Sequence, residues 1–271
     1  MNPFRYHLIL ALTTLLFGFQ RGAEAKGYEL IIVAGQSNAQ GWKGNAAELV
    51  ANPKVDSNIP FYYVYPEGKG ENAIENKSND WETLGPQKGR FPAGHFGPEI
   101  QLAREVYKAK HHPAVFKYSR GATSLCGAWQ SEGDGKLTDG MLKHLGRALQ
   151  LMKDNGDTVH VGAFVWIQGE SDSRNGDRGK YAAAFNALIK SVEKATGETG
   201  FPIILGIDEQ HKATAANTAI LEHHKDYAAT HANAEFTSML GLEKADATHL
   251  TPPALLEHGK VLFVAYQKLN P

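Results

Sequence analysis

The sequence has one cysteine, Cys126, among its 271 residues, so no internal disulfide can form. A fold without disulfides must be stabilised by its hydrophobic core, and a chain of this length is long enough to bury one. No pattern around Cys126 marks it as a catalytic thiol. We therefore expect it to be a small buried side chain.

An excess of charge of either sign is also absent. The 28 Lys and Arg residues nearly balance the 29 Asp and Glu residues, and the formal net charge is -1. Long-range attraction to phosphate backbones or anionic membranes needs a broad positive field, which this composition does not supply. Nucleic acid is therefore not an expected partner.

The apolar run near the N-terminus, Leu8 to Phe19, is shorter than the about 20 residues that span a bilayer. It follows Arg5 and precedes Ala23-Glu24-Ala25, a small-x-small pattern typical of a signal-peptide cleavage site. A membrane anchor is the competing interpretation. We expect residues 1–25 to be a cleaved signal peptide and residues 26–271 to form a single domain, exported to the periplasm or the medium without stable membrane insertion after cleavage.

Motifs for metals and nucleotides are missing as well. The sequence has no His-Glu-x-x-His and no Walker-type loop, and its adjacent histidine pairs, His111-His112 and His223-His224, fall on predicted helices. Glu170 and Asp172 are unsuited to glycoside hydrolysis, because carboxylates two positions apart on a loop rarely frame a bond from opposite sides. We expect no metal and no cofactor.

What the sequence does contain is a regular alternation of strand and helix patterns. Apolar, β-branched and aromatic runs predict strands at 28–34, 61–65, 114–118, 159–167 and 202–207. Stripes of helical period predict helices at 100–107, 141–152, 181–192, 213–229 and 253–268. This alternation predicts an α/β fold, a three-layer α/β/α sandwich with a central, mostly parallel sheet. The segment 66–96 interrupts the pattern, and we expect it to form a rim over the site.

The first predicted strand runs into Gly35-Gln36-Ser37-Asn38, where a turn would present a serine hydroxyl at the carboxyl edge of the sheet. Gly35 supplies the backbone freedom that a sharp turn needs. A serine becomes a useful nucleophile only when a base removes its proton, so a plain structural turn is the alternative until partners are found. The Gly-x-Ser-x-Gly elbow does not fit, because Ala39 stands at its second glycine.

His249 has the best local context for such a base among the 12 histidines. Asp246 lies three residues earlier, and in a turn its carboxylate can reach the imidazole, fix its tautomer and stabilise the imidazolium. The pair precedes a predicted helix and therefore lies on a loop, where catalytic groups often occur.

Two further strand ends offer hydrogen-bond donors for the oxyanion that acyl transfer creates. Gly121 follows the strand 114–118, and its backbone N–H can approach a ligand closely because glycine has no Cβ. Gln168 follows the strand 159–167 and carries a side-chain N–H. Each could be an ordinary turn, but their placement after successive strands favours a site.

These segments resemble the carbohydrate-acetylesterase branch of the SGNH hydrolases, which includes sialate O-acetylesterases and the acetylxylan esterases of carbohydrate esterase family six. The resemblance spans nearly the whole mature chain and implies the SGNH, flavodoxin-like form of the three-layer fold. The matching segments, in the family's order, are Gly35-Gln36-Ser37-Asn38, Gly121-Ala122-Thr123, Trp166-Ile167-Gln168-Gly169-Glu170-Ser171-Asp172 and Asp246-Ala247-Thr248-His249.

Carried onto this sequence, the resemblance implies Ser37 as nucleophile, His249 as general base and acid, and Asp246 as the residue that orients it. The oxyanion donors would be the backbone N–H groups of Ser37 and Gly121 and the side chain of Gln168.

The resemblance also implies a supporting role for Glu170 and Asp172, with either acid as an alternative partner of His249. Gly97, within a family-like segment Phe96-Gly97-Pro98-Glu99, would support the site as well. The chain departs from relatives that carry two glycines before the threonine, because it has Gly121-Ala122 there.

The expected function is a serine esterase that removes O-acetyl groups from a carbohydrate of the acetylxylan or sialate type through an acetyl-enzyme intermediate. A non-catalytic carbohydrate-binding protein on the same fold is one alternative. A lipase or thioesterase for longer acyl chains is the other.

Overall fold

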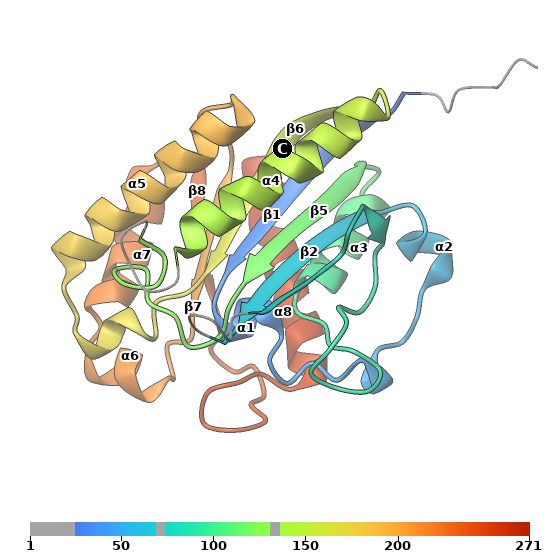
Figure 1. Ribbon diagram of the computed structural model, residues 1–271. Helices are drawn as coiled ribbons and strands as arrows, with labels where there is room; N and C mark the ends of the chain where they lie inside the picture. Colours follow the sequence, from blue (N-terminus) through green and yellow to red (C-terminus); the bar gives the residue numbers. More distant parts are fainter. Residues whose placement is uncertain (1–24, 69–73, 131–135) are drawn as a thin grey trace, which may run out of the picture.

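A computed structural model describes residues 25–68, 74–130 and 136–271. These residues form an α/β fold in which a central sheet lies between two groups of helices (Figure 1). The predicted three-layer α/β/α architecture is confirmed. The predicted signal peptide, residues 1–25, lies outside the described residues except for Ala25, and it stays a prediction.

The central sheet is mixed but mostly parallel. Strands β2, β5, β1, β6, β7 and β8 run parallel to their neighbours, and β3 and β4 (Glu82–Thr83) pair antiparallel with β2 at the edge. The strand order is β3 (Ile74–Lys77), β2 (Pro60–Glu67), β5 (Pro113–Ser119), β1 (Gly27–Gly35), β6 (Thr158–Ile167), β7 (Ile203–Ile207) and β8 (Ala234–Ser238).

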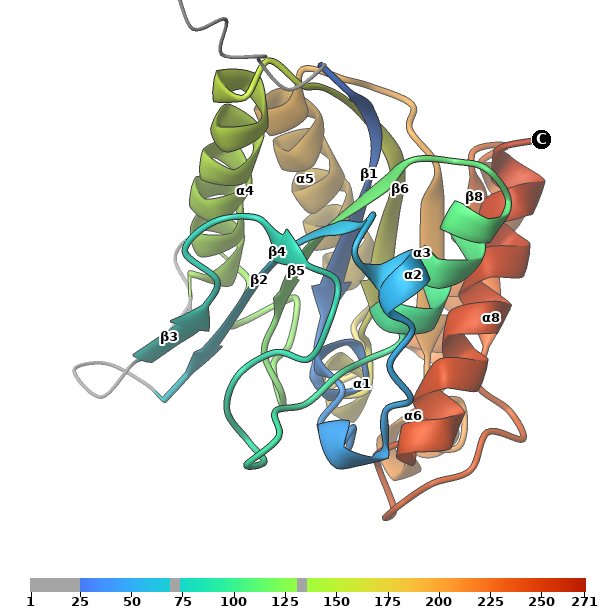
Figure 2. The ribbon, with the colours of Figure 1, turned by 90° about the vertical axis from the view of Figure 1, so that its right-hand side faces the viewer.

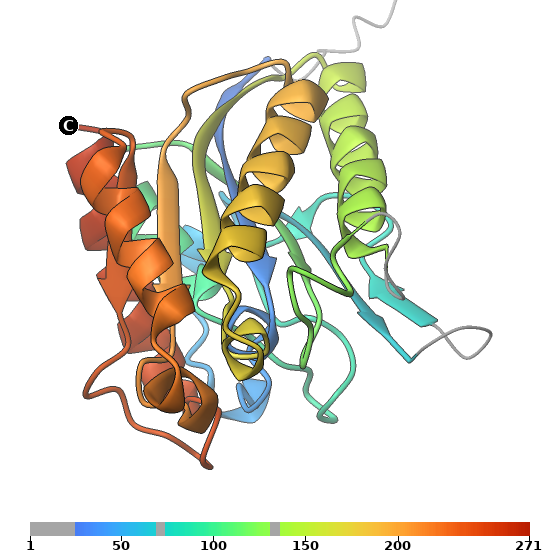
Figure 3. The same ribbon diagram turned by 90° about the vertical axis from the view of Figure 1, so that its left-hand side faces the viewer.

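Helices cover both faces of this sheet, as Figures 2 and 3 show from opposite sides. One face packs against α4 (Leu137–Asp154), α5 (Arg178–Thr196) and α7 (Ala219–Thr230), and the other against α3 (Glu99–Lys108) and α8 (Pro252–Leu269). Short helices connect these elements: α1 (Ser37–Gln40), α2 (Pro53–Asp56), α6 (Lys212–Ala216) and the 3₁₀ turns Ala46–Glu48 and Asp172–Arg174.

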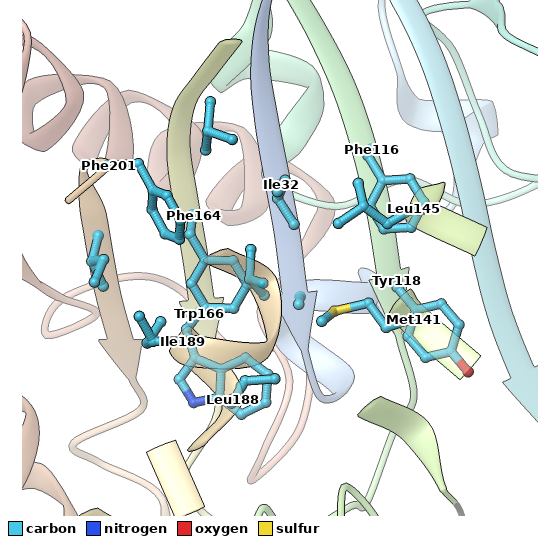
Figure 4. Packing of buried hydrophobic residues seen from close by; sticks show 14 of the residues in the cluster. Ile32, Phe116, Tyr118, Met141, Leu145, Phe164, Trp166, Leu188, Ile189 and Phe201 are labelled. Atoms are coloured by element: carbon cyan, nitrogen blue, oxygen red, sulfur yellow. The ribbon is translucent and has the colours of Figure 1, made fainter. Parts of the chain in front are cut away.

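The buried strands are apolar on both faces because successive side chains point to opposite sides of the sheet. In β1, Leu30 and Ile32 belong to the core under α4 and α5, whereas Ile31 belongs to the core under α3 and α8. Figure 4 shows the first of these cores, with Ile32, Phe116 and Phe164 of the sheet and Met141 and Leu145 of α4. This continuous burial explains why the strands read as unbroken apolar runs.

Two regions differ from the sequence prediction. The helix predicted at 213–229 is divided into α6 and α7, because Asn217 adopts an extended backbone and its Oδ1 accepts from the N–H of Ala219 at 3.2 Å. Strands β3, β4 and β8 were not predicted, since all three are short and polar or only partly apolar at the ends of the sheet.

Cys126 is exposed, so its predicted burial is wrong. Its backbone N–H donates to Oδ1 of the buried Asp172 at 2.9 Å, so the main chain is anchored while the residue stays exposed in the loop after β5. Partial desolvation of the sulfur and the nearby Asp172 carboxylate raise the pKa of the thiol to about 12. A thiol that stays protonated at neutral pH is a poor nucleophile.

Among the described residues, none of the helices is long and apolar enough to cross a membrane.

Candidate active site

The turn after β1 depends on Gly35. Its φ is 140°, and a Cβ at this position would lie 2.1 Å from the carbonyl oxygen of Ile167 on β6. The next N–H, of Gln36, donates to that same oxygen at 3.0 Å. The chain can therefore leave the sheet only through a glycine here, and it enters α1 with Ser37, which is 4% exposed.

Ser37 and His249 line the same pocket, which has a volume of about 230 Å³. The pocket lies beyond the carboxyl ends of the central strands, where open α/β sheets bind their ligands. Its other lining residues are Gln36, Trp42, Gly121, Ala122, Glu170, Ser171, Arg174, His211 and Thr248.

Asp246 holds His249 in a defined orientation. Both carboxylate oxygens of Asp246 lie 2.9 Å from His249 Nδ1, and Oδ1 also accepts from the backbone N–H groups of Thr248 and His249 at 2.9 Å. Partial desolvation raises the pKa of Asp246, but these hydrogen bonds outweigh it and hold the pKa well below its usual range. An ionised Asp246 assigns the proton to Nδ1, which leaves the lone pair of a base on Nε2.

Two contacts fix the loop that carries His249 against α1, which begins with Ser37. The side chain of Asn38 donates to the carbonyl of Thr248 at 3.2 Å and accepts from the N–H of Leu250 at 3.3 Å. The ring of Trp42 stacks on His249, with centroids 5.9 Å apart and an interplanar angle of 24°. The guanidinium of Arg90 covers Trp42 at 3.2 Å from the ring centroid. The predicted rim segment 66–96 therefore contacts the site through Arg90.

The predicted oxyanion donors occupy different environments. Gly121 lines the pocket, but its N–H donates to Gln40 Oε1 at 3.0 Å. Ser37 is the first residue of α1, and the N–H groups of the first turn of a helix have no hydrogen-bond partner within the helix. Ala122, where the resemblance leads us to expect a second glycine, adopts φ 57°, a left-handed conformation that favours glycine.

Gln168 does not line the pocket. It is fully buried, and its Nε2 contacts Asp172 Oδ2 at 2.6 Å, the carbonyl of Thr123 at 3.0 Å and Gln36 Oε1 at 3.3 Å. Its Oε1 accepts from the hydroxyl of Tyr181 at 2.9 Å. These contacts brace the strand ends around the pocket, and they differ from those of a side chain directed at an oxyanion.

The two acids of the Gln168 loop have different partners, and neither bonds to His249 in the described residues. Asp172 accepts from the N–H groups of Leu125 and Cys126 at 2.7 and 2.9 Å, and so it holds the loop after β5. Glu170 instead lines the pocket and accepts from the N–H of Asp208 at 3.1 Å. Asp246 is thus the acid that contacts the histidine.

Gly97 lies beneath α1, beside a fully buried ion pair between Lys117 and Glu99 at 2.6 Å. Its N–H donates to Glu99 Oε1 at 3.0 Å, and Lys117 Nζ donates to the carbonyl of Gln40 at the end of α1 at 3.1 Å. A Cβ on Gly97 would lie 2.7 Å from the carbonyl oxygen of Ala39. Gly97 therefore allows the chain to close over the ion pair that supports α1.

The sequence did not predict the positions of Trp42 or of the ion pair between the buried Asp208 and the partly exposed Lys244. Asp208 is fully buried and lies 2.5 Å from Lys244 Nζ, which connects the end of β7 to the loop that carries Asp246 and His249. Asp208 directly follows the predicted strand 202–207. Its position at a strand end, like those of Gly121 and Gln168, is therefore a signal that could have identified it. Nothing in the sequence around Trp42 marks it.

Three aromatic side chains of the rim segment pack inward. Phe96 and His95 are fully buried, and Trp81 donates its indole N–H to the carbonyl of Ala148 at 2.9 Å. Trp42, which lies outside this segment, lines the pocket beside Ser37.

Within the described ranges, no cluster of three or more His, Cys, Asp or Glu residues could hold a metal ion.

A family model described as "Carbohydrate esterase, sialic acid-specific acetylesterase" matches residues 27–268. The chain belongs to this carbohydrate esterase family. The match covers the fold from β1 to the last turn of α8 and all the segments that line the pocket. The resemblance to the SGNH carbohydrate acetylesterases is confirmed.

Solved structures share the fold of this carbohydrate esterase. NanS has a TM-score of 0.61 at 15% identity, over 90% of this chain and 98% of that chain. A protein from Arabidopsis thaliana has a TM-score of 0.60 at 20% identity, over 88% of this chain and 97% of that chain. A carbohydrate acetylesterase from Xanthomonas citri has a TM-score of 0.59 at 18% identity, over 89% of this chain and 56% of that chain. No protein with a curated description matches the sequence significantly.

Proposed function

We propose that this carbohydrate esterase removes O-acetyl groups from sugar hydroxyls, with Ser37 as the nucleophile. The observation that carries the proposal is that Ser37 shares a pocket with His249, whose Nδ1 is held by Asp246 at 2.9 Å. A serine beside a histidine that a carboxylate orients is the arrangement used for acyl transfer on many unrelated folds.

In the proposed reaction, Ser37 Oγ attacks the ester carbonyl while His249 Nε2 takes its proton. The tetrahedral intermediate collapses as His249 returns the proton to the leaving sugar oxygen, and an acetyl-enzyme remains. Water, activated by the same histidine, then releases acetate and restores the serine. The N–H of Ser37 is the predicted oxyanion donor that the geometry supports best, because Gly121 and Gln168 are already engaged within the protein.

The size of the pocket supports a short acyl group. A volume of about 230 Å³ accommodates an acetyl group and part of a ring, and it lies below the range of about 300–1,000 Å³ that drug-sized ligands occupy. This argues against the lipase or thioesterase alternative. A rate series from acetate to decanoate esters should therefore fall steeply with chain length.

The decisive test is Ser37→Ala. This variant should lose at least about 10³-fold in kcat on 4-nitrophenyl acetate while its far-UV circular dichroism and Tm stay those of the parent. A serine-directed phosphonate should label Ser37 in the parent. Full activity in the variant would refute the nucleophile, and an unlabelled, inactive parent would favour a carbohydrate-binding protein without turnover.

We also propose that the mature protein begins after Ala25 and is exported. N-terminal sequencing of the protein recovered outside the cytoplasm of the producing cell should begin at Lys26. An N-terminus at Met1 on exported protein would contradict cleavage.

A further inference from the structure

Glu170 has an unpaired oxygen at the pocket wall. The residue is 1% exposed and lines the pocket beside Ser37. Its Oε1 accepts from the N–H of Asp208 at 3.1 Å, but its Oε2 has no hydrogen-bond partner among the described residues. A buried polar atom left unpaired is costly, so one that lines a pocket points to a ligand as its missing partner.

The pKa of Glu170 lies near neutrality, so its protonated form is populated at neutral pH. Burial raises this pKa to about 7. Hydrogen bonds from the backbone N–H groups of Glu170 and Asp208 oppose the rise, and the Asp208 carboxylate adds to it. Lys244 counteracts it, but Lys244 is paired with Asp208 at 2.5 Å. Arg174 and His211 are the other charged or titratable groups that line this side of the pocket. A carboxylic acid donates one hydrogen bond and accepts others, which complements a hydroxyl group.

A second cavity, of about 680 Å³, adjoins the first on the side of Glu170. The two share Arg174, His211 and Thr248 as lining residues. Glu170 and His211 follow β6 and β7, which lie on one side of β1, whereas Gly121 follows β5 on the other. An acetyl group and part of a sugar ring fit the smaller pocket, and the larger cavity offers room for the rest of the sugar.

We propose that the sugar extends from the smaller pocket into the larger cavity and that Glu170 Oε2, on the wall of the smaller pocket, hydrogen-bonds a hydroxyl of the sugar ring, which makes Glu170 a specificity-determining residue. This inference rests on the proposed function, because it assigns the leaving group of that reaction to this side. Glu170 thereby differs from Asp172, whose carboxylate is bonded within the protein.

The test compares two substrates, an O-acetylated monosaccharide and 4-nitrophenyl acetate, which carries no sugar hydroxyl. In Glu170→Ala, the ratio of kcat/KM for the sugar to that for 4-nitrophenyl acetate should fall about tenfold, mainly through KM, as expected for one lost hydrogen bond. Glu170→Gln keeps the shape and an N–H donor and should restore most of the ratio. In the matched control Asp172→Asn, both rates should fall together and the ratio should stay unchanged.

An unchanged ratio in Glu170→Ala would overturn the proposal, and so would a Glu170→Gln variant as defective as Glu170→Ala. Binding to Ser37→Ala separates this inference from the proposed function, because it needs no turnover. Calorimetric affinity of Ser37→Ala for the acetylated monosaccharide should fall about tenfold when Glu170→Ala is added. An equal affinity would reject the contact even if the esterase reaction is correct.

Discussion

Asn38 binds the main chain on both sides of His249, donating to the carbonyl of Thr248 at 3.2 Å and accepting from the N–H of Leu250 at 3.3 Å. Asn38 is the residue after Ser37 in α1 and is 2% exposed. One buried amide therefore sets the distance between the proposed nucleophile and its base. The proposed reaction requires that distance to be held, because proton transfer demands hydrogen-bond contact.

Asn38→Ala should lower kcat by about 10²-fold, since small displacements of catalytic groups cost about that much. The loss of two hydrogen bonds should lower the free energy of unfolding by about 1–3 kcal/mol. Steady-state kinetics and urea titration measure the two effects. Asn45→Ala, which removes an amide that caps the turn at 46–48, is the matched control and should keep kcat within about twofold. Equal kinetics in both variants would reject the positioning role.

Asp246→Asn should lower kcat by about 10³–10⁴-fold, because an amide no longer fixes the tautomer of His249 or stabilises its cation. The measurement is kcat on 4-nitrophenyl acetate. Lys43→Ala is the control, because Lys43 lies 3.4 Å from Asp246 in an exposed ion pair and should matter little. A mild defect in Asp246→Asn would contradict the orienting role of Asp246 and favour Glu170 or Asp172 instead.

Stability should fall on acidification because of buried histidines such as His258 on α8. His258 is fully buried, and burial lowers its pKa to about 4. The unfolded chain therefore binds more protons than the native state between about pH 6.5 and pH 4. As the pH falls through this window, each such histidine lowers the free energy of unfolding by up to about 1.4 kcal/mol per pH unit.

In His258→Leu, the loss of unfolding free energy between pH 7 and pH 5 should be smaller than in the parent by about 2 kcal/mol. Urea titrations at the two pH values give this difference. His112→Leu, at an exposed position, should keep the parent's dependence. An identical loss in His258→Leu and the parent would show that His258 is not the group responsible.

Gly97→Ala should destabilise the protein by about 1–3 kcal/mol and lower kcat, because the added Cβ would lie 2.5 Å from Glu99 Oε2 and 2.7 Å from the carbonyl oxygen of Ala39. Gly146→Ala on α4 is the matched control. Nothing lies within 4 Å of its added Cβ, and alanine should stabilise the helix by about 1 kcal/mol. Thermal unfolding of the two variants should thus shift in opposite directions.

The parts of the fold that could be predicted from the sequence are those with dense local signals. The strand around Ile32 is apolar on both faces, and the helix around Met141 repeats its apolar residues on one side, so both were predicted with small errors at their ends. Strand β8 was not predicted because the polar residues Glu235 and Ser238 interrupt its apolar pattern. Its pairing with β7 in the sheet is what defines it as a strand.

In the candidate site, too, contacts between residues close in the sequence could be predicted and contacts between distant residues could not. Asp246 and His249 are three residues apart, so their contact could be predicted from their spacing. The contacts of Gln168 could not, because its neighbours Thr123 and Tyr181 come from other elements and meet it only in the folded core. The stacking of Trp42 on His249 likewise depends on two loops that are distant in the sequence.

The hydrogen bonds that shape the turn at Gly35 also bear on how the protein folds. The N–H of Gln36 reaches the carbonyl of Ile167, and the N–H of Arg120 reaches the carbonyl of Gly35, so the turn is completed by strands from distant parts of the chain. Contacts between such distant segments carry a large loop-closure cost and form slowly. During refolding, helical content should therefore return before esterase activity, which can reappear only once β1, β5 and β6 have joined.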